Sequence, residues 1–199
     1  MPSQTFTIAA ATDNEDIYTY SQQGVYPPTT HTTVETNVNT LITEKSYFPS
    51  FTEYDLEVTL LRWDTSTLPA GVHIDSANLL LYVTQINNSD SRNLTASYYS
   101  WSGQSNGDWT SGVDSGAITD TPLANFTVAA VNTLPLLNPG TNINRSGYTG
   151  IRLTMSGGKP SGKNEFYIAS YSNANHPAAQ LVVNYSTLTD PNFVGAIPL

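Results

Sequence analysis

Residues 60–83 constrain the fold of this chain more than any other stretch, because hydrophobic and polar side chains alternate there in two runs. Leu61 and Trp63 fall on one face of the first run, and Leu79 and Leu81 fall on one face of the second. A period of two places alternate side chains on opposite sides of a sheet. A proline and a glycine break the chain between the runs. The stretch therefore predicts two strands of a β-sandwich wall, with Trp63 in the core.

The rest of the chain consists of further short apolar runs separated by Gly, Pro, Asn and Asp, and no window of ten residues shows convincing helical periodicity. Many short strands with turn signals between them are typical of a sandwich or barrel. We expect strands near residues 6–11, 17–20, 37–42, 94–101, 126–131, 148–155, 165–171 and 180–185, and a hairpin turn at residues 157–163. The pattern predicts an all-β fold.

A chain of 199 residues is long enough for one domain with a core of its own. We expect a single jelly-roll β-sandwich over residues 1–185, with long loops and a long irregular segment at residues 18–55. Residues 186–199 form an apolar C-terminal arm in this interpretation, whose candidate assembly contacts are Phe193, Val194, Ile197 and Leu199. An apolar arm outside the strand pattern packs on its own domain or docks on another chain, and the sequence leaves both open.

Charge and cysteine content exclude several classes of function. Charged residues make up 12% of the chain, and the formal net charge is −9. Such a chain repels phosphate backbones and anionic lipids, so we expect neither a nucleic acid nor a membrane as partner. The absence of cysteine removes disulfides and thiolate sites. The first residues lack the pattern of a signal peptide, so we expect synthesis in a host cytoplasm without secretion.

A set of motifs spaced along the chain points to one family. Leu-Arg-Trp-Asp stands at residues 61–64, a Leu-Pro-x-Gly-x-x-Ile-x-x-Ala turn at 68–77 and Leu-Leu-Leu-Tyr-Val at 79–83. An opening strand runs into Asp13, and the chain closes with an aromatic strand at 166–170, His176-Pro177 and Leu-Val-Val-Asn-Tyr at 181–185. This order resembles the jelly-roll domains called DNRLRE domains, which are related in fold to family-six carbohydrate-binding modules. The resemblance covers residues 5–186 and implies a non-catalytic role in attachment or surface structure, as in phage virion and bacterial surface proteins.

Three carboxylates near the first strand form the one candidate metal site. Asp13, Glu15 and Asp16 supply the oxygen ligands that calcium prefers, and jelly-roll modules often hold a structural calcium there. The cluster lacks the Asp-x-Asp-x-Asp-Gly order of a calcium loop, which favours a solvated turn. We therefore expect no cofactor, with a structural calcium ion as the alternative.

Aromatic side chains in and after the strand expected at residues 94–101 are candidates for sugar binding. An exposed aromatic ring offers a flat apolar face on which a sugar ring can stack. Tyr99, Trp101 and Trp109 are the candidate platforms, and Trp109 stands in a polar loop. Burial in a core is the competing interpretation for each of them.

The sequence carries no pattern that predicts catalysis. The three histidines lack metal-ligand spacing, no Gly-x-Ser-x-Gly elbow is present, and pairs of acidic residues arise by chance among sixteen. We therefore expect a non-enzymatic phage virion protein, in a capsid decoration, tail or fibre. Its expected partners are other virion proteins and copies of itself, with a host glycan as a further partner. The alternative is a carbohydrate-binding module that attaches to a cell surface or polysaccharide.

Overall fold

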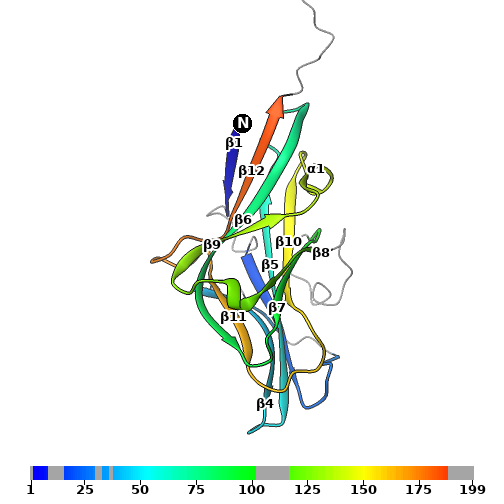
Figure 1. Ribbon diagram of the computed structural model, residues 1–199, viewed down its shortest axis with the longest axis vertical. Coiled ribbons are helices and arrows are strands. Elements are labelled where there is room, and N and C mark those ends of the chain that lie inside the picture. Colours follow the sequence, from blue (N-terminus) through cyan, green and yellow to red (C-terminus); the bar gives the residue numbers. More distant parts are fainter. Residues whose placement is uncertain (1, 9–15, 30–32, 36–37, 102–116, 188–199) are drawn as a thin grey trace, which may run out of the picture.

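The computed structural model describes residues 2–8, 16–29, 33–35, 38–101 and 117–187. Within them the chain forms antiparallel strands that curl around one main apolar core (Figure 1). The strands are β1 (Ser3–Thr7), β2 (Asp16–Gln23), β3 (Thr33–Glu35), β4 (Thr40–Phe48), β5 (Glu53–Asp64), β6 (Val72–Asn88), β7 (Asn93–Tyr98), β8 (Ala117–Pro122), β9 (Ala130–Leu136), β10 (Tyr148–Met155), β11 (Asn164–Ala169) and β12 (Gln180–Thr187). A 3-10 turn at Leu123–Asn125 and the one-turn helix α1 (Pro139–Asn142) are the helical segments of the described part. The all-β expectation is confirmed.

The strand order describes the curled sheet. Hydrogen-bonded neighbours run β1-β12-β6-β11-β4-β5-β10-β7-β8, while β2 joins β5 to β3 and β9 joins β6. β4 is the strand that connects the two halves, because it pairs with β11 along one edge and with β5 along the other. In Figure 1, β1, β12 and the start of β6 lie at the upper end, and β4 and β5 meet at the lower end.

The strands predicted from residues 60–83 are present, but they do not pair with each other. β5 pairs with β2, β4 and β10, whereas β6 pairs with β9, β11 and β12. The connection between them turns at Gly71, whose φ of 74° lies in the left-handed region that favours glycine. The chain therefore passes there from one half of the curled sheet to the other.

Trp63 lies in the core, as the alternation predicts. Its side chain is fully buried together with Leu61, Leu79 and Leu81. The indole Nε1 donates a hydrogen bond to the Ala179 carbonyl oxygen at 3.2 Å. The large ring is thus buried without leaving its one polar atom unpaired.

Three local expectations were wrong. The strand expected at 126–131 begins at Ala130 and runs to Leu136, because an edge strand tolerates the proline within it. Residues 157–163 are not a hairpin turn, since β10 and β11 pair with different strands and the loop crosses between them. The segment 18–55, expected to be irregular, contains most of β2, all of β3 and β4 and the start of β5.

No helix in the described part of the chain has the length and apolar composition needed to cross a membrane. The helical segments there are one turn each, so neither approaches the span of a bilayer.

Candidate functional site

Most of the residues singled out from the sequence lie outside the described part of the chain. Asp13, Glu15, Trp109, Phe193, Val194, Ile197 and Leu199 are all outside it, and for Asp16 the backbone alone is described, as the first residue of β2. Among the described residues no group of three or more His, Asp or Glu side chains is arranged to hold a metal ion. The calcium site and the contacts of the C-terminal arm therefore stay predictions.

The two described sugar-stacking candidates are buried. Tyr99 is 5% and Trp101 7% exposed, and both pack on Val58 and Leu60 in a small second core. Arginine side chains lie over their rings: the Arg152 guanidinium carbon is 4.6 Å from the Tyr99 ring centroid and that of Arg62 is 4.7 Å from the Trp101 ring centroid. Neither ring presents a free face as a platform.

The strongest candidate for a functional surface in the described part is the turn between β4 and β5. Phe51 is 72% exposed there, the largest exposure among the large hydrophobic side chains. Val25, 61% exposed, stands in the bend after β2. The bend lies against the turn, because a Cβ added at Gly24 would be 3.6 Å from the Thr52 carbonyl oxygen. We call this surface, made by residues 24–26 and 49–52, the hairpin tip.

The backbone of the hairpin tip is held in a costly conformation. Pro49 ends β4, and the Phe51 amide donates to the Phe48 carbonyl oxygen at 3.1 Å. Thr52 has a φ of 57°, which is rare for a residue branched at Cβ. Strained backbone of this kind occurs disproportionately at functional sites. The turn therefore projects Phe51 outward at a conformational cost.

Tyrosine rings support the hairpin tip from below. Tyr54 of β5 stacks on Tyr47 of β4, with ring centroids 4.7 Å apart, and Tyr26 from the bend packs on Tyr54 at 5.5 Å. The Lys159 ammonium lies 4.9 Å from the Tyr54 ring centroid. Its hydrogen bond with Tyr54 raises the pKa of Lys159. The aromatic run at 47–54 thus packs mostly inward and leaves Phe51 outside.

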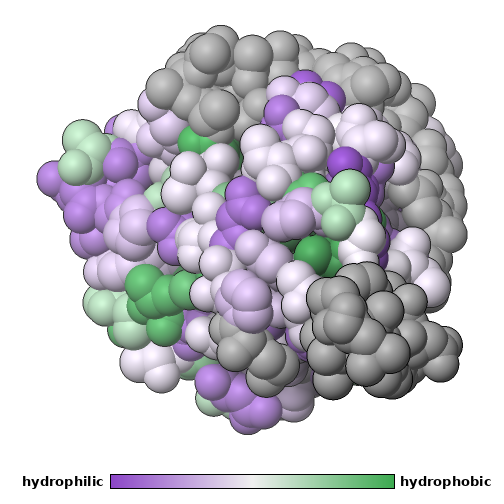
Figure 2. Space-filling view, turned by 90° about the horizontal axis from the view of Figure 1, so that it is seen from above, coloured by the Kyte–Doolittle hydropathy of each residue, from purple (hydrophilic) through white to green (hydrophobic). Residues whose placement is uncertain are grey.

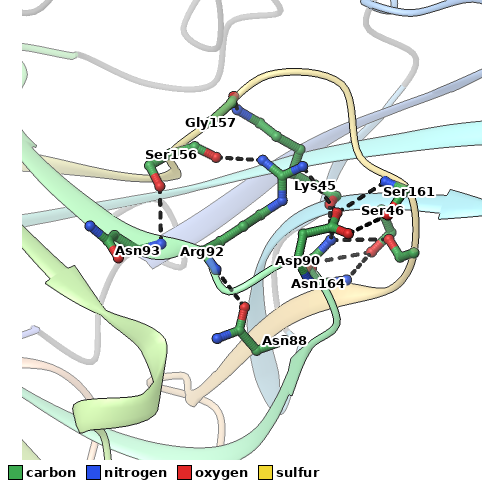
Figure 3. Close-up of polar contacts among 11 residues, drawn as sticks. Lys45, Ser46, Asn88, Asp90, Arg92, Asn93, Ser156, Gly157, Ser161 and Asn164 are labelled. Carbon is green, nitrogen blue, oxygen red and sulfur yellow. Dashed lines mark hydrogen bonds and ion pairs between the residues drawn. The ribbon is translucent and has the colours of Figure 1, made fainter.

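A polar network holds the loop that delivers Lys159 (Figure 3). Asp90 accepts hydrogen bonds from the backbone amide and hydroxyl of Ser161, from Asn164 Nδ2 at 2.9 Å and from Arg92 at 3.1 Å. These donors, those of Ser161 foremost, hold the pKa of Asp90 well below its usual range. The carboxylate therefore joins the 89–92 turn to the loop between β10 and β11.

Two cations complete the support of that loop. Figure 3 shows the side chains of Arg92 and Lys45 reaching the carbonyl oxygens of Ser156 and Gly157, at 2.6 and 2.8 Å. Burial, together with the nearby Arg92 charge, lowers the pKa of Lys45 to about 8. The loop is therefore fixed by charge-assisted hydrogen bonds, which are stronger than neutral ones.

A hollow of about 160 Å³ lies beside the buried Trp101. Its walls are Ser100, Trp101, Tyr148 and Gly150. Tyr148 is 43% exposed, and its ring centroid lies 4.7 Å from the Arg62 guanidinium carbon. Sequence reasoning missed Tyr148, because it opens an ordinary-looking strand and only the cross-strand packing brings it next to Arg62.

The chemistry of the hairpin tip suits binding. Its outer surface includes the exposed apolar side chains of Val25 and Phe51, and Lys159 contacts the Tyr54 ring that supports them. The aromatic composition and Pro49 signal a turn in the sequence, but nothing in the pattern distinguishes the outward Phe51 from its buried neighbours.

Comparison of the sequence with protein-family models and with curated proteins finds no match to either.

Proposed function

We propose that this protein is a non-enzymatic structural component of a virion that acts through protein–protein contacts, with the hairpin tip as one contact surface. The observation that carries the proposal is the outward projection of Phe51 and Val25, 72% and 61% exposed, from a firmly supported turn. Large apolar side chains exposed together at a rigid projection are typical of interaction sites.

The position of the hairpin tip fits such a role. It lies at the lower end in Figure 1, while β12, the last described strand, ends at the opposite pole. Contacts at both poles would let copies of an elongated molecule bridge other components of a particle. The resemblance to jelly-roll domains, which occur in phage virion and bacterial surface proteins, agrees with this assignment.

The test replaces Phe51 by serine and measures incorporation into particles. Burial of a phenylalanine side chain contributes about 2–3 kcal/mol, so F51S should lower the occupancy of the protein in purified particles at least about tenfold. Leu137→Ser is the matched control, because Leu137 is 58% exposed and precedes α1, away from the tip. Quantitative mass spectrometry of particles made with each variant gives the occupancy.

The occupancies test the hairpin tip as a contact surface separately from the virion assignment. F51S and L137S proteins should melt within a few degrees of the parent, because both side chains are mostly solvated in the free protein. Equal occupancy of F51S and parent particles would rule out the tip as a contact. Absence of the parent protein from particles would refute the virion assignment itself.

Sugar binding is a second candidate, favoured by the hollow beside Tyr148. An exposed tyrosine next to a small polar hollow and a guanidinium can stack on a sugar and bond its hydroxyls. A glycan array probed with the intact protein tests it: a signal lost in Tyr148→Ala supports the candidate, and a blank array removes it.

A further inference from the structure

Three glutamates stand side by side across the strands that join the two halves of the sheet. In the antiparallel register Glu165 of β11 is directly opposite Glu44 of β4, and Glu44 is directly opposite Glu57 of β5. Directly opposite residues share a face of the sheet, with Cβ atoms about 4.5–5.5 Å apart. Glu44 and Glu165 are 5% and 2% exposed, so water screens their charges weakly. We call these residues the glutamate row.

Glu165 is held by a cation and two amide groups. Lys163 Nζ lies 2.8 Å from Glu165 Oε1, and Asn87 and Gln85 of β6 donate hydrogen bonds to Oε2. Both oxygens of the Glu165 carboxyl are thus held by neighbouring side chains, and the charge of Glu165 is one of the causes that raise the pKa of Glu44.

The surroundings of Glu44 favour its protonated form. Its Oε1 is buried and has no hydrogen-bond partner among the described residues. The groups that act on Glu44 are Ser46 on its own strand, Asp55 on β5, and Lys163 and Glu165 at β11. Glu57 of β5 is directly opposite Glu44, and both glutamates raise the pKa of Tyr167 on β11. Lys163 is the cation that acts on Glu44, and it is already paired with Glu165. Lys45 lines the same hollow as Glu44, but its ammonium group donates to the Gly157 carbonyl oxygen. Burial first and the neighbouring carboxylates next raise the pKa of Glu44 to about 8, against a hydrogen bond from Ser46 that lowers it.

Glu44 also has access to solvent protons. It lines a hollow of about 160 Å³ with Lys45, Leu56, Glu57, Val58, Thr154 and Met155. That volume holds several water molecules. The hollow lies where β4 and β10 meet along β5, since β4 pairs with residues 53–57 and β10 with residues 59–64 of that strand.

We propose that Glu44 is a proton-sensitive switch: its protonated form keeps β4 paired with β5 and β11, and loss of the proton loosens these pairings. Deprotonation places three adjacent negative charges across the strand that connects the two halves of the sheet. Like charges directly opposite each other destabilise a strand pair. The loosened segment is the β4–β5 hairpin, so the switch would reach the hairpin tip, but the inference does not depend on the function proposed for the tip.

The expected pH dependence follows from the direction of the shift. An ordinary glutamate titrates near 4.5, and folded Glu44 titrates near 8. Between these values the folded protein binds a proton that the unfolded chain does not, so stability falls as the pH rises. The contribution is complete below pH 4.5 and lost as the pH passes about 8.

Denaturation of the intact protein and its variants between pH 5 and pH 9 tests the switch. The urea midpoint of the parent should fall steadily over this range. Glu44→Gln mimics the protonated acid, so its midpoint should change much less. Glu53→Gln is the matched control, since Glu53 is on β5 opposite Phe48 and outside the glutamate row, and its midpoint should fall as in the parent. Equal slopes for E44Q and the parent would overturn the proposal.

Two further measurements test the proposal even if the E44Q variant fails to fold. Carbon NMR of selectively labelled glutamate side chains should show one carboxyl, absent from the E44Q or Glu44→Asp spectrum, that titrates near pH 8. If every glutamate carboxyl titrates below pH 6, the proposal is wrong. Amide hydrogen exchange in β4 and β5, corrected for its intrinsic pH dependence, should accelerate above pH 8 relative to β12. Parallel behaviour of these strands would also contradict the switch.

Discussion

Gly150 shows how one missing side chain permits a second core outside the first. Tyr98 packs in the main core, while Tyr99 and Trp101 turn to the other side and pack on Val58 and Leu60. The Tyr99 amide donates to the Gly150 carbonyl oxygen at 3.0 Å, so the chain after β7 passes directly over β10 at this point. A Cβ at Gly150 would collide with the Tyr99 carbonyl oxygen and press on the Trp101 indole. The close passage therefore requires glycine.

The first prediction concerns this contact. Gly150→Ala should lower the free energy of unfolding by about 1–3 kcal/mol, because the methyl group meets backbone that cannot move aside. Gly158→Ala is the matched control, since a Cβ there has open space around it, and it should leave stability within about 1 kcal/mol of the parent. Urea unfolding followed by tryptophan fluorescence measures both. Equal effects of the two substitutions would show that Gly150 has no special packing role.

Individual residues differ in how well the sequence predicts their places. The strict alternation around Trp63 predicts that it lies in the core, and its side chain is fully buried. Tyr99 and Trp101 come after the alternation of β7 has ended, so periodicity says nothing of which surface covers them. Their burial depends on Arg62, Arg152 and the crossing at Gly150, which are distant in sequence.

At the scale of elements, the loop between β10 and β11 depends on one carboxylate. Asp90 bonds Ser161, Asn164 and Arg92, and the loop in turn positions Lys159 over Tyr54. Strands β10 and β11 belong to different halves of the sheet, so this loop has no hairpin pairing of its own. The side-chain network replaces the backbone pairing that a hairpin would provide.

The second prediction is the cost of removing that charge. Asp90→Asn should destabilise the protein by about 2 kcal/mol at pH 7, because hydrogen bonds to a charged acceptor become weaker neutral ones. The depressed pKa of Asp90 means that its contribution is present above pH 4 and lost as the pH falls below the ordinary aspartate value of 3.8. The acid limb of the stability curve should therefore be shallower in D90N.

Asp120→Asn controls for the loss of a surface charge. Asp120 is exposed on β8 and accepts bonds from Asn93 and Thr95, so its substitution should cost less than about 1 kcal/mol. Thermal unfolding between pH 2.5 and pH 7 measures both variants. If D120N is destabilised as much as D90N, the network has no particular role in holding the loop.

Strands with an uninterrupted alternation of apolar and polar residues can be predicted from the sequence, but the strands with which they pair cannot. The alternation predicts both ends of β10 and the start of β12, because each strand is a clear run bounded by turn residues. The strand expected at 126–131 ends several residues before the end of β9. Pro135 disfavours a strand in the sequence, but β9 lies at the edge of the sheet, where a proline is tolerated. The glutamate row was invisible in the sequence because its members, Glu44, Glu57 and Glu165, meet only through long-range register.

At the scale of the whole molecule, acidic side chains outnumber the basic ones that could neutralise them. Six of the seven lysine and arginine side chains make contacts within the protein: Lys45, Arg62, Arg92, Arg152, Lys159 and Lys163. Viewed end-on, the described surface in Figure 2 is mostly hydrophilic or near neutral, with small separate hydrophobic patches. The polarity of this surface therefore comes from hydroxyl and amide groups together with a net negative charge.

The last prediction follows from the excess of acidic over basic residues. A net charge of −9 makes the folded molecule repel itself, and the cations that could offset the repulsion are held in local contacts. Salt shortens the Debye length from about 30 Å at 0.01 M to about 3 Å at 1 M. Raising sodium chloride from 20 mM to 500 mM at pH 8 should therefore raise the melting temperature by a few degrees.

The same salt step at pH 5 should have a smaller effect, because that pH is close to the isoelectric point of 4.4 and the net charge is small. Calorimetry at the two pH values and two salt concentrations measures the difference. A melting temperature that falls with salt at pH 8 would mean that the local attractive pairs, such as Lys163 with Glu165, outweigh the overall repulsion. In that case the stability of this fold would depend on the few cations rather than on the excess of acids.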